Sequence, residues 1–222
     1  RLEASPLDVI GTTFGTTWLI RMIITIIIIV LWFLMEKKNK ISIKEQIPLL
    51  VASLILIATT TMMGHGAATE LEAPWILDYA HNLLSSIWIG GVIFFAFVAL
   101  PTITKTDNST KEKIVLSLIP RFSGLFIIAI GILIITGPTL LWFLDDNVTS
   151  LTDSTYGKLI LIKIGIAATM IALGGFNQIK FLRNTHDFEK LNISKRISKP
   201  LKFEAGLGIA LLAVVALLVN SS

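Results

Sequence analysis

The sequence predicts an all-α, polytopic membrane protein, a bundle of six transmembrane helices with both chain ends on the outer side. Of its 222 residues, 54% are hydrophobic and 15% are charged, whereas a soluble domain has about 25% charged residues. The mean hydropathy is +0.79. The apolar residues form long blocks, and the basic residues gather between alternate blocks. This pattern excludes a soluble globular protein, a disordered chain and a nucleic-acid binder.

Six stretches are apolar enough to cross a bilayer, for which a helix needs about 20 residues. They lie at 15–35, 47–64, 79–101, 121–144, 156–180 and 201–219. Unbroken apolar runs such as Ile23 to Leu34 lack the alternation of a barrel strand, so helices are predicted. We take the six spans as a single membrane domain covering residues 1–222.

The loops between these stretches predict the orientation of the chain. Most of the 19 basic residues fall in the connections 36–46, 102–120 and 180–202. The positive-inside rule makes these loops cytoplasmic and places both termini outside. We therefore expect a multi-pass protein of the cytoplasmic membrane of a prokaryote, with membrane lipid as a partner. The outer segments are acidic, which would concentrate cations there or simply keep the loops solvated.

Spans one and five open with similar sequences, TFGTTWLIR from Thr13 and TYGKLILIK from Thr155. The two spans run in the same direction, which predicts a partial parallel internal repeat; chance similarity between apolar segments is the alternative. If spans three to six form one repeat half, the other half lacks two spans. We then expect two further helices before Arg1 in a longer chain.

Three ionisable residues fall inside the predicted spans. Arg21 and Lys163 close the two similar sequences. Each either extends outward to the interface or meets an outer carboxylate or a polar cavity. Glu204 lies just inside the cytoplasmic end of span six, where an interfacial pair with Lys202 is expected. The residues Thr136-Gly137-Pro138 are expected to kink span four.

Two histidines flank one outer connection. His65 ends span two, and His81 begins span three about a dozen residues later, so both imidazoles should lie at similar depth. Met62 is three residues before His65, on the same helical face, and Met63 is adjacent. Imidazole and thioether groups suit copper, and methionine favours the cuprous ion. The chain has no cysteine, which excludes thiolate sites.

The same helix carries residues that would support such a site. Asp78, Ser85 and Trp88 share a face with His81 at helical spacing. Asp78 is suited to orient the His81 ring through its second nitrogen. The alternative for both histidines is an interfacial position, with hydrogen bonds to helix ends or water.

The order of the motifs resembles the CopD family of membrane copper-resistance proteins. The resemblance covers nearly the whole chain and rests on the following pieces: Phe14-Gly15 with Arg21; Gly64-His65-Gly66-Ala67-Ala68; Asp78 with His81; Trp88-Ile89-Gly90-Gly91; Leu100-Pro101; Arg121-Phe122-Ser123; Thr136-Gly137; Tyr156-Gly157-Lys158 with Lys163; Asn177; and Glu204. The usual Gly-His-Ala is Gly-His-Gly here. The resemblance implies copper uptake or handling, with His65 and His81 as candidate ligands. Family members usually have about eight spans, and some carry an outer copper-binding domain of the CopC type.

These observations predict a copper-binding membrane protein, without enzymatic activity, that imports or handles copper at the outer face. An extracytoplasmic copper chaperone or subunits of a membrane complex are the expected partners. The sequence contains no nucleotide-binding glycine loop and no Ser–His–Asp arrangement. One alternative is an accessory subunit of a membrane enzyme complex, including a copper-dependent one. Another, less favoured, is an electron carrier that holds haem between His65 and His81.

Overall fold

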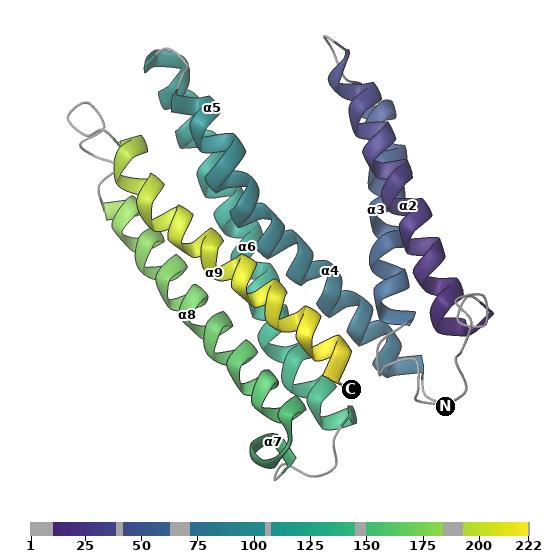
Figure 1. The fold of residues 1–222 in the computed structure, drawn as a ribbon. Coiled ribbons are helices and arrows are strands. Elements are labelled where there is room, and N and C mark those ends of the chain that lie inside the picture. The colour runs from purple at the N-terminus through teal and green to yellow at the C-terminus, as the bar shows by residue number, and fades with distance from the viewer. Residues whose placement is uncertain are drawn as a thin grey trace. The chain divides into compact units, whose positions relative to one another are not determined.

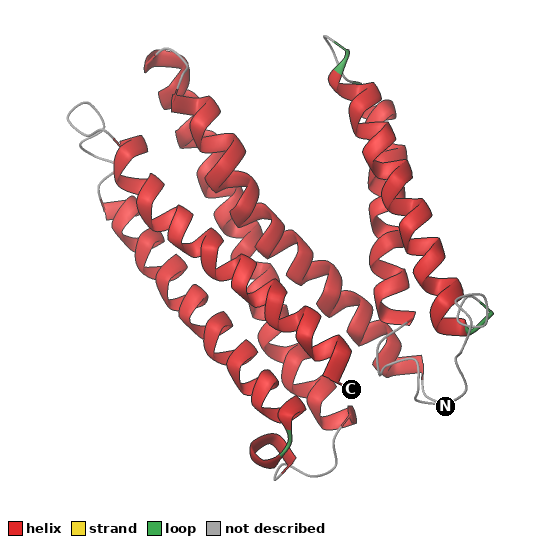
Figure 2. Cartoon of the chain, viewed as in Figure 1, coloured by secondary structure: helices red, strands yellow, loops and turns green. Residues whose placement is uncertain are grey.

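A computed structural model describes residues 11–38, 42–62, 72–104, 108–144, 150–183 and 193–221. In this part of the chain every regular element is a helix (Figure 2). The elements, in chain order, are α2 (Thr13–Glu36), α3 (Ile43–Met62), α4 (Glu72–Phe94), the π-helix η2 (Phe95–Ala99), α5 (Leu100–Thr104), α6 (Asn108–Leu144), α7 (Ser150–Asp153), α8 (Thr155–Arg183) and α9 (Ile193–Ser221) (Figure 1).

Six helical segments of the described chain are long and apolar enough to cross a membrane. They are Gly15–Glu36, Ile43–Met62, Pro74–Ile103, Pro120–Phe143, Thr155–Ile179 and Ser198–Val219. Each corresponds to one predicted span, with bounds that differ by a few residues, so the prediction of six helical spans is confirmed. The most apolar part of α2 buries none of its residues, as expected of a helix that faces lipid. The orientation derived from the loop charges stays a prediction.

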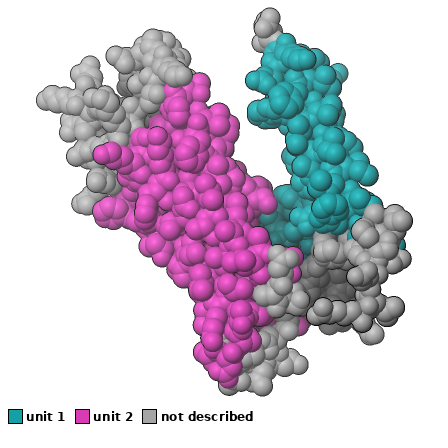
Figure 3. Space-filling model, in the orientation of Figure 1, with its two compact units in different colours: residues 1–83 teal, residues 84–222 magenta. Residues whose placement is uncertain are grey.

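The chain divides into two compact units, residues Arg1–Leu83 and Leu84–Ser222 (Figure 3). In unit 1, α2 packs along α3. In unit 2, α8 packs along α9, which also contacts η2 and α5. Helix α4 supplies its first half to unit 1 and its second half to unit 2. The treatment of residues 1–222 as a single domain stays a prediction.

The helices α2 and α8 begin in the same way. The Thr12 hydroxyl accepts a hydrogen bond from the Gly15 backbone N–H at 3.1 Å, and the Ser154 hydroxyl accepts one from Gly157 at 2.9 Å. In both helices a hydroxyl side chain therefore satisfies an N–H group that has no partner within the helix. This shared cap lies one residue before the two similar sequences and supports the predicted repeat.

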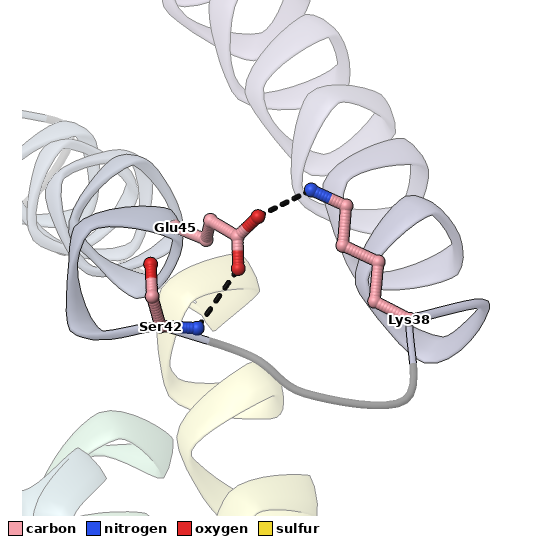
Figure 4. A network of polar contacts seen from close by, with 3 residues as sticks. All are labelled: Lys38, Ser42 and Glu45. Atoms are coloured by element: carbon pink, nitrogen blue, oxygen red, sulfur yellow. Dashed lines mark hydrogen bonds and ion pairs between the residues drawn. The ribbon is translucent and has the colours of Figure 1, made fainter.

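The turn between α2 and α3 is closed by Glu45 (Figure 4). One carboxylate oxygen forms an ion pair with the Lys38 ammonium group, and the other accepts a hydrogen bond from the Ser42 backbone N–H at 2.8 Å. Ser42 and Glu45 thus supply half of a capping box at the start of α3. Both charged side chains reach water, so the ion pair positions the turn more than it stabilises the fold.

Unit 2 has a hydrophobic core formed by the second half of α4, by η2 and by α8 and α9. Its buried residues are Trp88, Ile89, Val92, Ala96, Met170, Ala205 and Leu211. A Cβ atom at Gly91 would lie 2.5 Å from Cζ of Phe126. The absence of a side chain at Gly91 therefore lets the aromatic ring of α6 lie against α4.

Two prolines of unit 2 are accommodated within continuous helices. Pro101 has no N–H group to donate, and η2 precedes it, with the Leu100 N–H bonded to the Phe95 carbonyl five residues back. Helix α6 runs without interruption through Pro138, so the expected irregularity at 136–138 does not end the span. The Thr136 hydroxyl donates to the Ile132 carbonyl at 3.0 Å.

Candidate metal centre

The candidate centre starts from His81, which lies on α4 between Asp78 and Ser85. All three side chains are half-buried. Because α4 is a regular helix over this stretch, residues spaced by three and four lie on the same face. The structure therefore confirms the helical placement on which the predicted grouping depends. Whether Asp78 and Ser85 orient the His81 ring stays a prediction.

Polar contacts join the start of α4 to α3 next to this face. The Asn82 amide donates to Asp78 Oδ2 at 3.1 Å and lies 3.5 Å from the Thr61 hydroxyl, to which it also donates. One turn earlier, the Tyr79 hydroxyl donates to the Leu54 carbonyl at 3.4 Å. Thr61 is fully buried. These bonds hold the second half of α3 beside the third turn of α4.

This contact joins the residues that lie next to two of the predicted ligands. Thr61 immediately precedes Met62, and Asn82 immediately follows His81. Met62 is the last residue of α3, and 57% of its surface is exposed, so its thioether is accessible at the helix end. Sequence reasoning overlooked Asn82 and Thr61. Asn82 could have been recognised from its spacing of four residues after Asp78, because side chains at this spacing often pair on a helix.

The other two predicted ligands, Met63 and His65, lie outside the described residues. Within the described ranges, no three His, Asp or Glu side chains gather closely enough to hold a metal ion. The four-residue ligand set Met62, Met63, His65 and His81 therefore stays a prediction. The structure places Met62 at the end of α3 and His81 nine residues after the start of α4 at Glu72, so His81 lies inside the helix rather than at its start, the position predicted from the sequence.

Trp88, predicted to support the ligands, belongs to the core of unit 2. Only 4% of its surface is exposed, and it packs with the cluster around Ile89 and Met170. It lies seven residues beyond His81, about 10 Å further along the helix axis. Burial of a large aromatic ring accounts for this residue through packing, and its support of a metal site stays a prediction.

The paired basic residues Arg21 and Lys163 occupy equivalent positions in their own helices. Each is the eighth residue after the first residue of its helix, Thr13 in α2 and Thr155 in α8. Both are half-buried. At about 12 Å along the axis, a long side chain reaches back toward the interface. The structure therefore supports their equivalence in the repeat.

Glu204 occupies a position different from the expected one. Only 6% of its surface is exposed, and its carboxyl group faces α8, where it is hydrogen-bonded to the Asn177 side chain. Lys202, its expected interfacial partner, is exposed. The reason is a gap in the surface of α8. A Cβ atom at Gly174 would lie only 2.9 Å from Oε1 of Glu204, so glycine leaves room for the carboxyl group.

The burial of this carboxyl group has an energetic consequence. An ionised carboxylate in a protein interior costs several kcal/mol, even after relaxation of its surroundings. Such a group is usually neutralised by a proton or by a paired cation. The buried Glu204 and the half-buried Asn177 thus form a polar pair in unit 2 beside its hydrophobic cluster.

Comparison with known proteins connects both halves of the chain to copper. Residues 4–75 match the family described as "Copper resistance protein D-like, N-terminal domain". Residues 116–218 match the family described as "Copper resistance protein D". Over these two regions the predicted resemblance to the CopD family is confirmed. The two similar sequences of the predicted repeat lie at the starts of α2 and α8. The first falls within residues 4–75 and the second within residues 116–218.

Two curated relatives agree with this resemblance. The copper transport protein CutJ of Bacillus subtilis (strain 168) is 28% identical over 210 residues, which cover 92% of this chain and 36% of CutJ. The copper resistance protein D of Pseudomonas syringae pv. tomato is 26% identical over 232 residues, covering 97% of this chain and 71% of the relative. The chain thus spans about a third of CutJ. No solved structure matches. These matches support a copper-related membrane function.

Proposed function

We propose that this chain binds copper at the outer face of the cytoplasmic membrane and takes part in copper import or handling. The observation that carries the proposal is the contact between α3 and α4. Through Asn82 and Thr61, the structure holds the residue after His81 beside the residue before Met62. An imidazole inside α4 and a thioether at the end of the adjoining α3 are a suitable pair for a soft copper ion.

The remaining ligands would come from the connection that joins these two helices. His65 and Met63 follow Met62 directly in the sequence. A site of imidazole and thioether groups without carboxylate or thiolate ligands favours the cuprous ion. Asp78, hydrogen-bonded to Asn82, would lie behind His81 and hold its ring in place. The acidic outer segments would raise the local concentration of the cation.

The ion itself is the cargo in this proposal, and the chain supplies ligands rather than catalysis. Copper would be captured at the outer end of α3 and α4, delivered there by a chaperone or from solution. The family relatives are named for copper transport and for copper resistance, and the proposed binding step is common to both.

The test is copper binding by purified protein in lipid nanodiscs. Copper content is measured by mass spectrometry, and affinity by competition with a cuprous chelator, for wild type, His65→Ala and His81→Ala. We expect each variant to weaken binding by more than the 10–100-fold that loss of a supporting residue typically costs. The matched control is His186→Ala, which changes the third histidine, in the predicted cytoplasmic connection, and should bind copper normally.

The same samples separate the alternatives. Equal copper in wild type and His81→Ala would refute the site. A Soret absorbance that His81→Ala abolishes would indicate the haem carrier instead. Stable co-purification of an enzyme subunit, with no copper on the isolated chain, would favour the accessory-subunit function. Uptake of copper into proteoliposomes then distinguishes transport from storage at the membrane surface.

A further inference from the structure

We propose that Glu204, with Asn177 as its hydrogen-bonding partner, is a proton-binding site within the membrane. We further propose that its proton is exchanged when copper moves through the protein. The first statement stands on the geometry of unit 2 alone. The second rests on the proposed function and deepens it by naming the coupling ion.

The position of Glu204 inside unit 2 is the first argument. It lies six residues into the span Ser198–Val219, about 9 Å from the start of the span, and 94% of its surface is covered. Ionisable residues at this depth are rare and commonly mark ion or proton pathways. On the neighbouring turn of α9, Gly208 lies against Ile89 and Met170, which closes the apolar core above the carboxyl group.

The surroundings of Glu204 favour a proton over a metal ion or a salt bridge. On α9 the nearest basic residues, Lys199 and Lys202, are both exposed. The parts of α4, η2 and α5 within unit 2 contain no ionisable residue. Arg121, at the start of the membrane span within α6, is exposed. On α8 the basic residues nearest in sequence to Gly174, which adjoins Glu204, are Lys180, six residues later, and Lys163, eleven residues earlier.

The chemistry of the pair suits a group that gains and loses a proton. A protonated carboxyl group offers one O–H donor and one acceptor oxygen, and the asparagine amide offers the matching acceptor and donors. After ionisation, the carboxylate still accepts the amide N–H. One carboxylate with one amide is too few and too hard a ligand set for a cuprous ion.

Asn177 also offers a route to water. It is half-buried and lies two residues before the end of its span at Ile179, on the predicted cytoplasmic side. The amide therefore leads from the covered carboxyl group toward the aqueous phase. In the proposed step, the Glu204 O–H bond breaks, the proton passes to water on that side, and the carboxylate charge balances the single charge of a passing cuprous ion. The reverse step restores the acid.

Infrared difference spectroscopy tests the proton site without copper. Reconstituted wild-type protein at neutral pH should show the carbonyl band of a protonated carboxylic acid, which shifts in heavy water and is lost in Glu204→Gln. Asn177→Ala should keep the band and move it, because the amide hydrogen bond is lost. Glu45→Gln, which changes an exposed carboxylate, is the matched control and should leave the band intact. Absence of the band in wild type would overturn the proton site.

Copper uptake into proteoliposomes tests the coupling. In wild type and in Glu45→Gln, the rate of copper uptake should change with the imposed pH gradient. In Glu204→Gln, the change in rate caused by the same gradient should be at least ten-fold smaller. Copper binding at the outer face should be equal in all three. An unchanged pH dependence in Glu204→Gln would overturn the coupling. If wild type shows the band but neither binds nor takes up copper, the proposed function and the coupling fail while the proton site stands.

Discussion

Units 1 and 2 use polar groups in opposite ways. In unit 1 the described polar contacts between helices run from Asn82 and Tyr79 of α4 to the second half of α3. In unit 2 the buried Glu204 pairs with the half-buried Asn177 beside the hydrophobic cluster. Lipid tails give helices little hydrophobic reason to associate, so close packing and hydrogen bonds decide where they meet.

The difference teaches how each unit can serve function. A polar contact at a helix end leaves side chains such as Met62 accessible, which suits capture of an ion. A polar group enclosed by packed helices is shielded from water, which suits a protonation event. Glycines make the second arrangement feasible, because Gly174 gives the carboxyl group its place and Gly91 lets α6 approach α4.

The largest effect is expected from Gly91→Ala, which tests whether unit 2 depends on close packing. The new Cβ would lie 2.5 Å from the Phe126 ring, so ring and helix must shift, at a typical cost of about 1–3 kcal/mol. Chemical unfolding in detergent, with hydrogen exchange to resolve the region, measures the loss. Gly90→Ala is the matched control, since its Cβ would meet no atom within 4 Å.

A partial rescue would sharpen this assignment. Combining Gly91→Ala with Phe126→Leu removes the clashing ring atoms and should recover part of the lost stability. Equal stability of Gly91→Ala and Gly90→Ala would show that unit 2 does not depend on this close approach.

A smaller effect is expected from the two helix caps, which compare the units at equivalent positions. Thr12→Ala and Ser154→Ala each remove the hydroxyl that accepts from the N–H three residues on. Each loss should cost about 1 kcal/mol and should increase hydrogen exchange in the first turn of its own helix. Serine at position 12 and threonine at position 154 should restore protection. If only one of the two alanine variants has an effect, the starts of α2 and α8 are not equivalent.

The smallest effect is expected from Asn82→Ala, which tests the polar contact of unit 1. Hydrogen bonds between membrane helices contribute about 0.6 kcal/mol on average and at most about 1.7 kcal/mol. Hydrogen exchange should rise at the end of α3 and the start of α4 and stay unchanged in α8 and α9. Copper affinity should fall as the helix ends separate. Asn82→Asp, which keeps an acceptor but loses the amide donor, should not restore it.

Much of the fold could be predicted from the sequence. The six spans follow from runs of apolar residues, because a bilayer of fixed thickness requires helices of about 20 residues. The relation between spans one and five could be recognised from TFGTTWLIR and TYGKLILIK, and the matching caps of α2 and α8 support it. The family could be recognised from the order of short motifs, and both matched regions of the chain confirm it.

The candidate site was only partly predictable. Helical spacing placed Asp78, His81 and Ser85 on one face, because that spacing is a local property of a helix. The bond from Asn82 to Thr61 joins residues on different helices, and no local pattern signals it. Glu204 illustrates the same limit. Its distance from the end of span six suggested an interfacial pair with Lys202, whereas a glycine thirty residues earlier decides that the carboxyl group is buried.

The sequence by itself determined that this is a six-span helical membrane protein that resembles the CopD family, because local properties of the chain such as hydropathy, charge and motif order are sufficient for that. Only the tertiary structure decided that Asn82 ties α4 to α3 beside Met62, and that Gly174 and Asn177 enclose Glu204. Both outcomes depend on which helix faces lie against one another. Hydropathy does not select these faces within a membrane, since lipid and protein interior are equally apolar, whereas close packing and hydrogen bonds do.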